Sequence, residues 1–191
     1  MNKYLITLKN WSGYAAAITL MCFLIYIIGQ QGFRQSANSP QYEMAADAAK
    51  ALDKGADPKS LIAAGPAIEM SESLSPYLMI YDAVGNIAAG NVTLNGKPLK
   101  IPQVAIDYVP AHGSDVVTWQ PEPGVRHAMV GISTAKKAYI VVAGRSLDVV
   151  EERIATLGEL VLFGWAMSLI AMLVVVVLKQ MVAKRLEPQV V

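Results

Sequence analysis

Two long apolar stretches, one near each end of the chain, dominate its pattern of hydrophobic and polar positions. The first runs from about Trp11 to Ile28, and the second, from Leu160 to Leu178, contains no charged residue. Each has about the 18–20 apolar residues needed to cross ~30 Å of hydrocarbon at about 1.5 Å per residue. A buried helix of a soluble protein can be equally apolar, but two such runs flanking a small domain favour membrane-spanning helices.

The segment after the first stretch has the signals of a separate helix. Asn38 or Ser39 can act as N-cap, and Pro40 suits the first helical position. The sequence therefore predicts a helix from Pro40 to about Lys54. Gly55 follows where a left-handed C-terminal cap is favoured.

Strand-like runs separated by turn residues follow, with a short helix between the second and the third. Asn and Gly or Pro and Gly mark several of the turns, as is typical of antiparallel hairpins. From Leu147 the pattern is helical again, and no break separates this helix from the second apolar stretch. The sequence predicts an α+β domain, an antiparallel sheet with flanking helices. The predicted strands are 76–81, 87–90, 115–120, 125–132 and 138–144, and the helix in between begins at Pro102 and runs through Tyr108.

Two short stretches carry a family resemblance. They are Ile80-Tyr-Asp-Ala-Val-Gly-Asn-Ile87, and Val142-Ala-Gly-Arg-Ser-Leu147 with Val150-Glu-Glu-Arg153. With the order of the elements, they resemble the first hairpin and the last strand with its exit helix in the extracytoplasmic PAS-like (Cache) sensor domains of bacterial receptors and sensor kinases. The resemblance covers roughly residues 40–153. An unrelated α+β domain with the same element order is the alternative.

The positive charges beside the apolar stretches predict the orientation. Lys3 and Lys9 precede the first stretch, and three basic residues follow the second against the single acid Glu187. Both termini are therefore expected to be cytoplasmic and the middle extracytoplasmic, in the cell membrane. A cleaved signal peptide is the alternative for the first stretch, but residues 30–34 offer no small-x-small cleavage site. The predicted organisation is tail 1–10, span 11–31, domain 32–156, span 157–178 and tail 179–191.

Composition excludes several other classes of protein. Hydrophobic residues make up 54% and charged residues 16% of the chain, which is more apolar than an ordinary soluble domain. The net charge of +1 gives no reason to expect nucleic-acid binding. The single cysteine, Cys22, lies in the first apolar stretch, so no disulfide within the chain and no cysteine nucleophile are expected.

Signals of catalysis are absent from the sequence. It has no Ser-His-Asp set at a familiar spacing, no nucleophile elbow and no glycine-rich phosphate loop. His112 and His127, with Asp107 or Asp115, fit no zinc spacing, so both histidines are expected on the surface or in loops. We therefore expect no enzyme, no metal and no cofactor.

The PAS-like resemblance implies a ligand between the sheet and the helix or loop after the second strand. In the predicted strand 125–132, His127 shares a face with Val125 and Met129, whereas Arg126 lies on the other. Arg126 could hold a carboxylate or have a structural role. Plain core packing is the alternative for the aromatic candidates, and the small residues 88–90 leave little room for a ligand. The candidates are Tyr81, Tyr108, Trp119, Arg126, His127 and Tyr139.

Small residues one helical turn apart occur in both apolar stretches. Gly13-x-x-x-Ala17 and Gly164-x-x-x-Ser168 permit close helix approach, either between the two spans or between subunits. The pattern is also frequent by chance. Besides the lipid bilayer, the partners expected are a second copy or another membrane protein, and the small-molecule ligand is unknown.

The sequence supports two main hypotheses about function. The residues after Leu178 are too few for a kinase or cyclase output, so a sensor of this kind would signal through a partner in the membrane. The first hypothesis is therefore a sensory or regulatory accessory. The second is a structural or docking subunit of a larger membrane complex that senses nothing. Residues 183–188 also weakly resemble the start of a HAMP linker, as in a sensor kinase without its output half.

Overall fold

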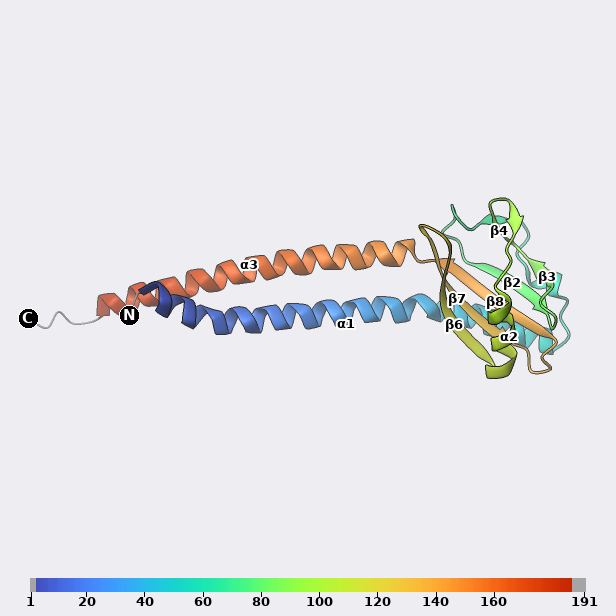
Figure 1. The fold of residues 1–191 in the computed structure, drawn as a ribbon, viewed down its shortest axis with the longest axis horizontal. Helices are drawn as coiled ribbons and strands as arrows, with labels where there is room; N and C mark the ends of the chain where they lie inside the picture. Colours follow the sequence, from blue (N-terminus) through green and yellow to red (C-terminus); the bar gives the residue numbers. More distant parts are fainter. Residues whose placement is uncertain (1–2, 187–191) are drawn as a thin grey trace, which may run out of the picture. The chain divides into compact units, whose positions relative to one another are not determined.

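The computed structural model describes residues 3–186 and divides the chain into two compact units (Figure 1). Residues 33–152 form the sheet unit, and residues 1–32 and 153–191 form the helical unit. Glu187 and the end of the linker-like stretch 183–188 lie outside the described residues.

The sheet unit is built on five antiparallel strands. Their order in the sheet is β3-β2-β8-β7-β6, so the last strand of the sequence lies at its centre. With helices on both faces, this confirms the α+β class, and the five predicted strands are confirmed to within a few residues. They are β2 (Tyr77–Asp82), β3 (Ile87–Gly90), β6 (Ser114–Glu122), β7 (Val125–Ser133) and β8 (Tyr139–Ser146).

A small sheet that the sequence did not predict has the order β1-β4-β5. Its strands are β1 (Ile68–Glu69), β4 (Val92–Leu94) and β5 (Lys97–Pro98), which are too short to show a period of two. The turn predicted at Asn95 and Gly96 joins β4 to β5, and both residues have positive φ, 53° and 70°. The Glu69 carboxylate accepts hydrogen bonds from the Gly96 and Asn95 amides, and these bonds, Gly96 first, lower the pKa of Glu69 to about 2.

The helix α1 (Lys3–Asp53) is continuous, so the predicted start at Pro40 is wrong. A proline inside a helix removes one hydrogen bond, here to the Ser36 carbonyl, and usually bends or breaks the helix. The alanine-rich run after Pro40 favours helix, whereas the polar residues just before it, Gln35-Ser-Ala-Asn-Ser39, favour helix only weakly. The predicted end is confirmed: Gly55 has φ 92°, and its amide donates to the Leu52 carbonyl at 2.9 Å.

Two helices cover the two faces of the large sheet. The last turns of α1 bury Ala45, Ala48, Ala49 and Leu52 against one face, which we call the α1 face. The helix α2 (Gln103–His112), predicted from Pro102, covers the other together with the small sheet, and we call it the α2 face. A short 3₁₀ helix (Pro58–Leu61) follows α1 and touches β3. The strand β2 is buried on both sides because a layer packs on each.

Three glycines on the α2 face leave room for larger neighbours. A Cβ placed on Gly144 would lie 2.3 Å from the phenol carbon and oxygen of Tyr77. A Cβ on Gly90 would lie 2.0 Å from the Met79 sulfur, and one on Gly131 would lie 2.9 Å from Val109. Large side chains on β2 and α2 therefore fill the space above the small residues of the sheet.

This packing makes Gly144 a sensitive position. Gly144→Ala is expected to lower the free energy of unfolding by about 1–3 kcal/mol, because the new methyl group overlaps the Tyr77 ring. In a Tyr77→Ala background, the same substitution should cost much less. Denaturant unfolding of the four variants of this cycle measures the difference. Equal costs in both backgrounds would contradict the packing argument.

The helical unit contains the first part of α1 and most of α3 (Asp148–Leu186). The most apolar 18-residue windows within Trp11–Asp53 and Asp148–Ala183 have mean hydropathies of 1.8 and 2.7, and by length and composition both helices can cross a membrane. The Trp165 indole N–H donates to the Thr19 hydroxyl at 2.9 Å. As predicted, α3 runs without a break into the second apolar stretch.

Candidate functional site

Aromatic and polar side chains gather on the α2 face. Tyr77 and Tyr81 of β2 and His127 of β7 are each 1% exposed, and Trp119 of β6 packs partly buried beside them. Alternation along each strand brings them to one side, and the predicted shared face of Val125, His127 and Met129 is confirmed. This is the face on which the PAS-like resemblance implies a ligand.

The cavity on the α2 face is small. Its volume is ≈ 30 Å³, and it lies between Ile106 and Val109 of α2 and the sheet residues Met129 and Ile140, with Asp115 at its edge. That volume holds about one water molecule, whereas small-molecule sites usually measure about 300–1,000 Å³. A ligand on this face would therefore have to move α2 or the side chains beneath it.

The six predicted ligand residues do not converge on one pocket. Tyr81, Trp119 and His127 lie on the α2 face, and the Tyr81 hydroxyl donates to the Leu99 carbonyl at 3.2 Å. Tyr108 is 44% exposed on α2 and stacks on His112, with ring centres 3.9 Å apart. Tyr139 packs against the core of the α1 face, and by alternation Arg126 lies on that side too.

His127 is a buried core residue, so the expectation of a surface or loop position is wrong for it. Its Nε2 lies 3.0 Å from the Met70 carbonyl oxygen, which only accepts, so Nε2 carries the hydrogen. Burial lowers the pKa of His127, although the Met70 carbonyl and Asp148 act in the opposite direction. The side chain is therefore neutral near pH 7, with a lone pair on Nδ1. His112 is exposed, so the expectation of a surface position is confirmed for this histidine.

Two neighbouring rings each carry a buried polar atom that has no hydrogen-bond partner among the described residues. These atoms are the Tyr77 hydroxyl oxygen and His127 Nδ1. The two rings are tilted by 45°, with their centres 5.6 Å apart. Burial raises the pKa of Tyr77, with a smaller contribution from Tyr81, so this hydroxyl stays protonated. A hydroxyl donor and an imidazole acceptor therefore face the same part of the core.

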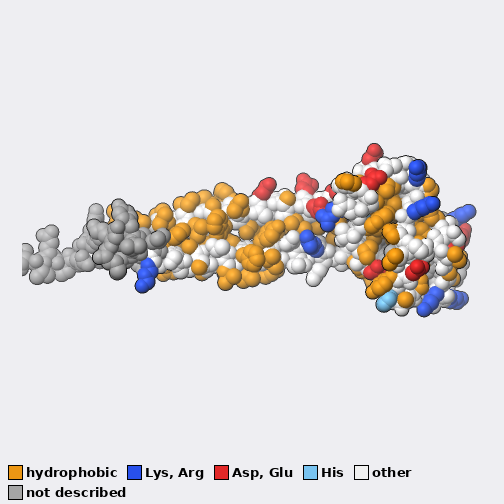
Figure 2. Space-filling view, viewed as in Figure 1, with side chains coloured by type: hydrophobic (Ala, Val, Ile, Leu, Met, Phe, Trp, Pro, Cys, Tyr) orange, Lys and Arg blue, Asp and Glu red, His pale blue; other side chains and the backbone are white. Residues whose placement is uncertain are grey.

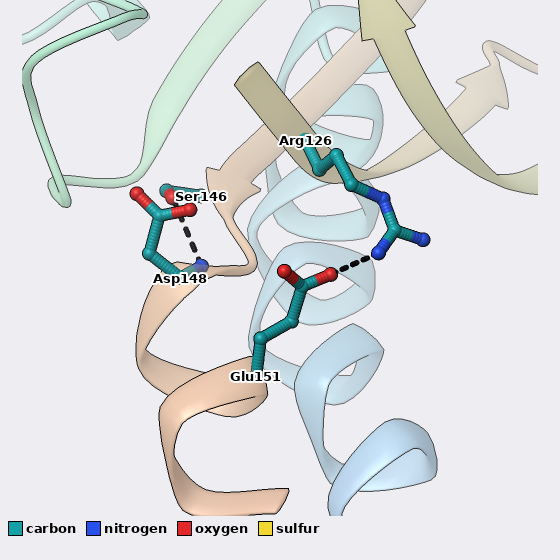
Figure 3. Close-up of polar contacts among 4 residues, drawn as sticks. All are labelled: Arg126, Ser146, Asp148 and Glu151. Carbon is teal, nitrogen blue, oxygen red and sulfur yellow. Dashed lines mark hydrogen bonds and ion pairs between the residues drawn. The ribbon is translucent and has the colours of Figure 1, made fainter. Parts of the chain in front are cut away.

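The start of α3 is fastened to β7 and β8, as Figure 3 shows. The Ser146 hydroxyl accepts from the Asp148 amide at 3.1 Å, and the Leu147 amide donates to the Arg126 carbonyl at 2.8 Å. The Arg126 guanidinium forms an ion pair with the Glu151 carboxylate. Both side chains are 42% exposed, so the pair is worth only about 0–1 kcal/mol. The first-turn acids Asp148 and Glu151 also suit the helix dipole.

These contacts join β7 and β8 to the first turn of α3. Sequence reasoning assigned Arg126 to a ligand carboxylate or a structural role, and the structure places a carboxylate of the chain itself against it. Nothing in the sequence pairs residues 126 and 151, because the contact depends on how β7 lies beside the end of β8. The alternation of acids and bases near Leu147 was the only available signal.

The small-residue motifs do not form the contact between α1 and α3. A Cβ on Gly13 or on Gly164 would meet nothing within 4 Å. The close approach occurs instead at Gly29, where a Cβ would lie 2.6 Å from Leu157. A role for Gly13, Ala17, Gly164 and Ser168 in contacts between subunits stays a prediction.

Among the described residues, no group of three or more His, Cys, Asp or Glu side chains could hold a metal ion. The expectations of no enzymatic activity and no cofactor stay predictions.

Comparison with known proteins gives little further information. No protein-family model matches the chain, and no curated protein does. Among solved structures, the chain is similar to a Cache chemosensory domain studied for its recognition of carboxylic acids. The sequence identity is 13%, the match covers 76% of this chain and 96% of that chain, and the TM-score is 0.27. At this TM-score the likeness assigns no ligand to this chain.

The two tyrosines of β2 allow a matched test. Tyr81→Phe should lower the free energy of unfolding by about 1 kcal/mol, because the Leu99 carbonyl loses its donor. Tyr77→Phe should be neutral or stabilising, because it removes a buried hydroxyl that has no partner among the described residues. Denaturant unfolding of both variants checks the contrast. A clear cost for Tyr77→Phe would reveal a bound water or another partner at that hydroxyl.

His127 should also make stability depend on pH. Because burial holds the pKa of His127 below its ordinary value of 6.5, its contribution to stability is present above that pH and is lost as the pH falls through the folded pKa. The melting temperature should therefore fall between about pH 7.5 and about pH 5, and it should fall less in His127→Gln. His112→Gln is the matched control and should behave like the wild type. An equal fall in all three proteins would contradict this assignment.

Proposed function

We propose that this chain is a sensory or regulatory membrane protein whose extracytoplasmic sheet unit acts on a membrane partner through α3. Two helices that can cross a membrane support the membrane assignment. Large apolar side chains along them are exposed, including Phe23 at 59%, Ile28 at 70% and Phe163 at 68%, and the apolar surface is visible in Figure 2. Surfaces of this kind are stable in lipid or against a partner.

One observation carries the proposal. β8, the central strand of the sheet, ends at Ser146, and α3 begins at Asp148 and continues as one helix through the second apolar stretch. Only Leu147 separates strand from helix. A displacement of the end of β8 is therefore a displacement of the start of α3, with no flexible linker to absorb it.

The α2 face is the side on which we place the input. Tyr77, Met79 and Val109 fill the space above the sheet glycines, so a ligand or partner acts there by moving α2 or the small sheet. The response is limited by the difference in affinity between the two states of the domain. The basic residues at Lys3, Lys9 and Lys179 support an extracytoplasmic sheet unit.

The proposal predicts both a partner and a response. Tagged full-length protein, purified in mild detergent from its own membrane, should bring a membrane protein with it at constant stoichiometry. In thermal-shift screening of the same preparation, at least one small molecule should raise its melting temperature. A partner without any ligand response would instead support the docking subunit. Purified protein that brings no membrane partner with it would contradict the proposal.

The predicted orientation of the chain in the membrane can be tested separately by cysteine labelling. In a Cys22→Ser background, a cysteine introduced at exposed Asp57 should react with a membrane-impermeant maleimide on intact cells. A cysteine introduced at Lys9 should react only after lysis. The reverse pattern would place the sheet unit in the cytoplasm.

A further inference from the structure

Residues 126 and 127 of β7 connect the buried residues of the α2 face with the contacts at the start of α3. They are neighbours in one strand, so their side chains lie on opposite faces of the sheet. His127 faces the buried α2 side, whereas Arg126 forms the ion pair with Glu151 in the first turn of α3. The Arg126 carbonyl also accepts from the Leu147 amide, so the backbone at this point contacts the strand–helix connection. A shift of this dipeptide moves both contacts.

The surroundings of His127 contain few groups that respond to a charge. The Met70 carbonyl accepts a hydrogen bond from Nε2–H, and the Tyr77 ring of β2 lies beside the imidazole. Trp119 of β6 and Ser146 of β8 are its cross-strand neighbours. Among the acids of the described part, Asp148 of α3 is the one that acts on it electrostatically. A proton on Nδ1 would therefore meet the Tyr77 hydroxyl and the field of Asp148.

We propose that Arg126 and His127 form a proton-responsive switch, in which protonation of His127 weakens the ion pair between Arg126 and Glu151 in the first turn of α3. The neutral imidazole has no donor for Asp148, whereas the protonated ring gains an Nδ1–H and a positive charge. Figure 3 shows the Asp148 carboxylate on the Ser146 side of the helix and the Glu151 carboxylate on the Arg126 side. Attraction between Asp148 and the protonated ring shifts the first turn of α3, and this shift weakens the ion pair that Glu151 of the same turn forms with Arg126.

The Arg126–Glu151 pair suits this role because it is half exposed and weak. An ion pair of this strength positions the first turn of α3 but can be broken at little cost. One new charge on His127 is therefore enough to shift the equilibrium between the paired and the unpaired state. The inference rests on the proposed function only where α3 is taken as the output helix. The movement itself is a property of the chain alone.

Hydrogen exchange of the full-length protein in detergent tests the switch. The readout is the protection of the amides of residues 147–153, corrected for the intrinsic effect of pH, at about pH 7.5 and about pH 5. In the wild type, protection should fall on acidification by up to about fivefold, because the ion pair contributes at most about 1 kcal/mol. His127→Gln should keep its protection, and His112→Gln should respond like the wild type. Arg126→Gln should be poorly protected at both pH values.

Two outcomes would overturn the switch. One is a wild-type protein whose first turn of α3 keeps its protection at the lower pH. The other is a His127→Gln protein that still loses protection, which would assign the effect to Asp148 and Glu151 themselves. Tyr77→Phe is a second variant in case His127→Gln does not fold. Because the ring beside His127 then has no polar group that can stabilise the added proton, its loss of protection should begin at a lower pH, and an unchanged midpoint would also count against the switch.

These results are independent of the test for a partner. A pH response at α3 in a protein that binds no membrane partner would keep the switch and reject the proposed function. A partner and a ligand response without the pH effect would support the proposed function and reject the switch.

Discussion

The pairing of β8 with β2 on one side and with β7 on the other holds the sheet unit together. Without β8, the hairpin of β2 and β3 has no hydrogen-bonded connection to β7 and β6 in the large sheet. The side chains of β8 also divide between the two cores: Ile140 and Val142 face α2, and Val141 and Ala143 face α1. Both layers of the domain therefore depend on a strand formed late in the sequence, which continues almost directly into α3.

The same strand explains why the α2 face is full. Gly144 of β8 lets the Tyr77 ring lie flat on the sheet, and Gly131 of β7 does the same for Val109. The space above these small residues is filled by side chains from other elements. The remaining cavity holds about one water molecule. Sensing on this face, as we propose it, is therefore a rearrangement of packed side chains and not the filling of an open pocket.

Local signals predicted most of the fold. The strands, their turns and the unbroken exit helix follow from periodicity and from turn residues such as Asn95 and Gly96. The proline rule failed at Pro40, where α1 continues into an alanine-rich run of good helix formers in spite of one lost hydrogen bond. The small sheet was missed because its strands have only two or three residues.

The site was predicted less well, since its contacts join residues far apart in the sequence. His127 is buried because a carbonyl 57 positions away, at Met70, accepts from its ring. Arg126 meets Glu151 only because the pairing of β7 with β8 places it beside the start of α3. A single sequence specifies the face on which each side chain lies, through the alternation of a strand. It does not specify which partner the fold brings to that face.

The continuous course of α1 through Pro40 has a mechanical consequence. The Ser36 carbonyl has no backbone donor four residues on, so α1 has one weakened turn close to the boundary between the units at residues 32 and 33. Residues 148–186 of α3 contain no proline. Of the two helices that join the units, α1 is therefore the compliant one and α3 the stiff one. In the function that we propose, α3 is therefore the helix that passes a movement of the sheet unit on, whereas α1 can bend at this turn.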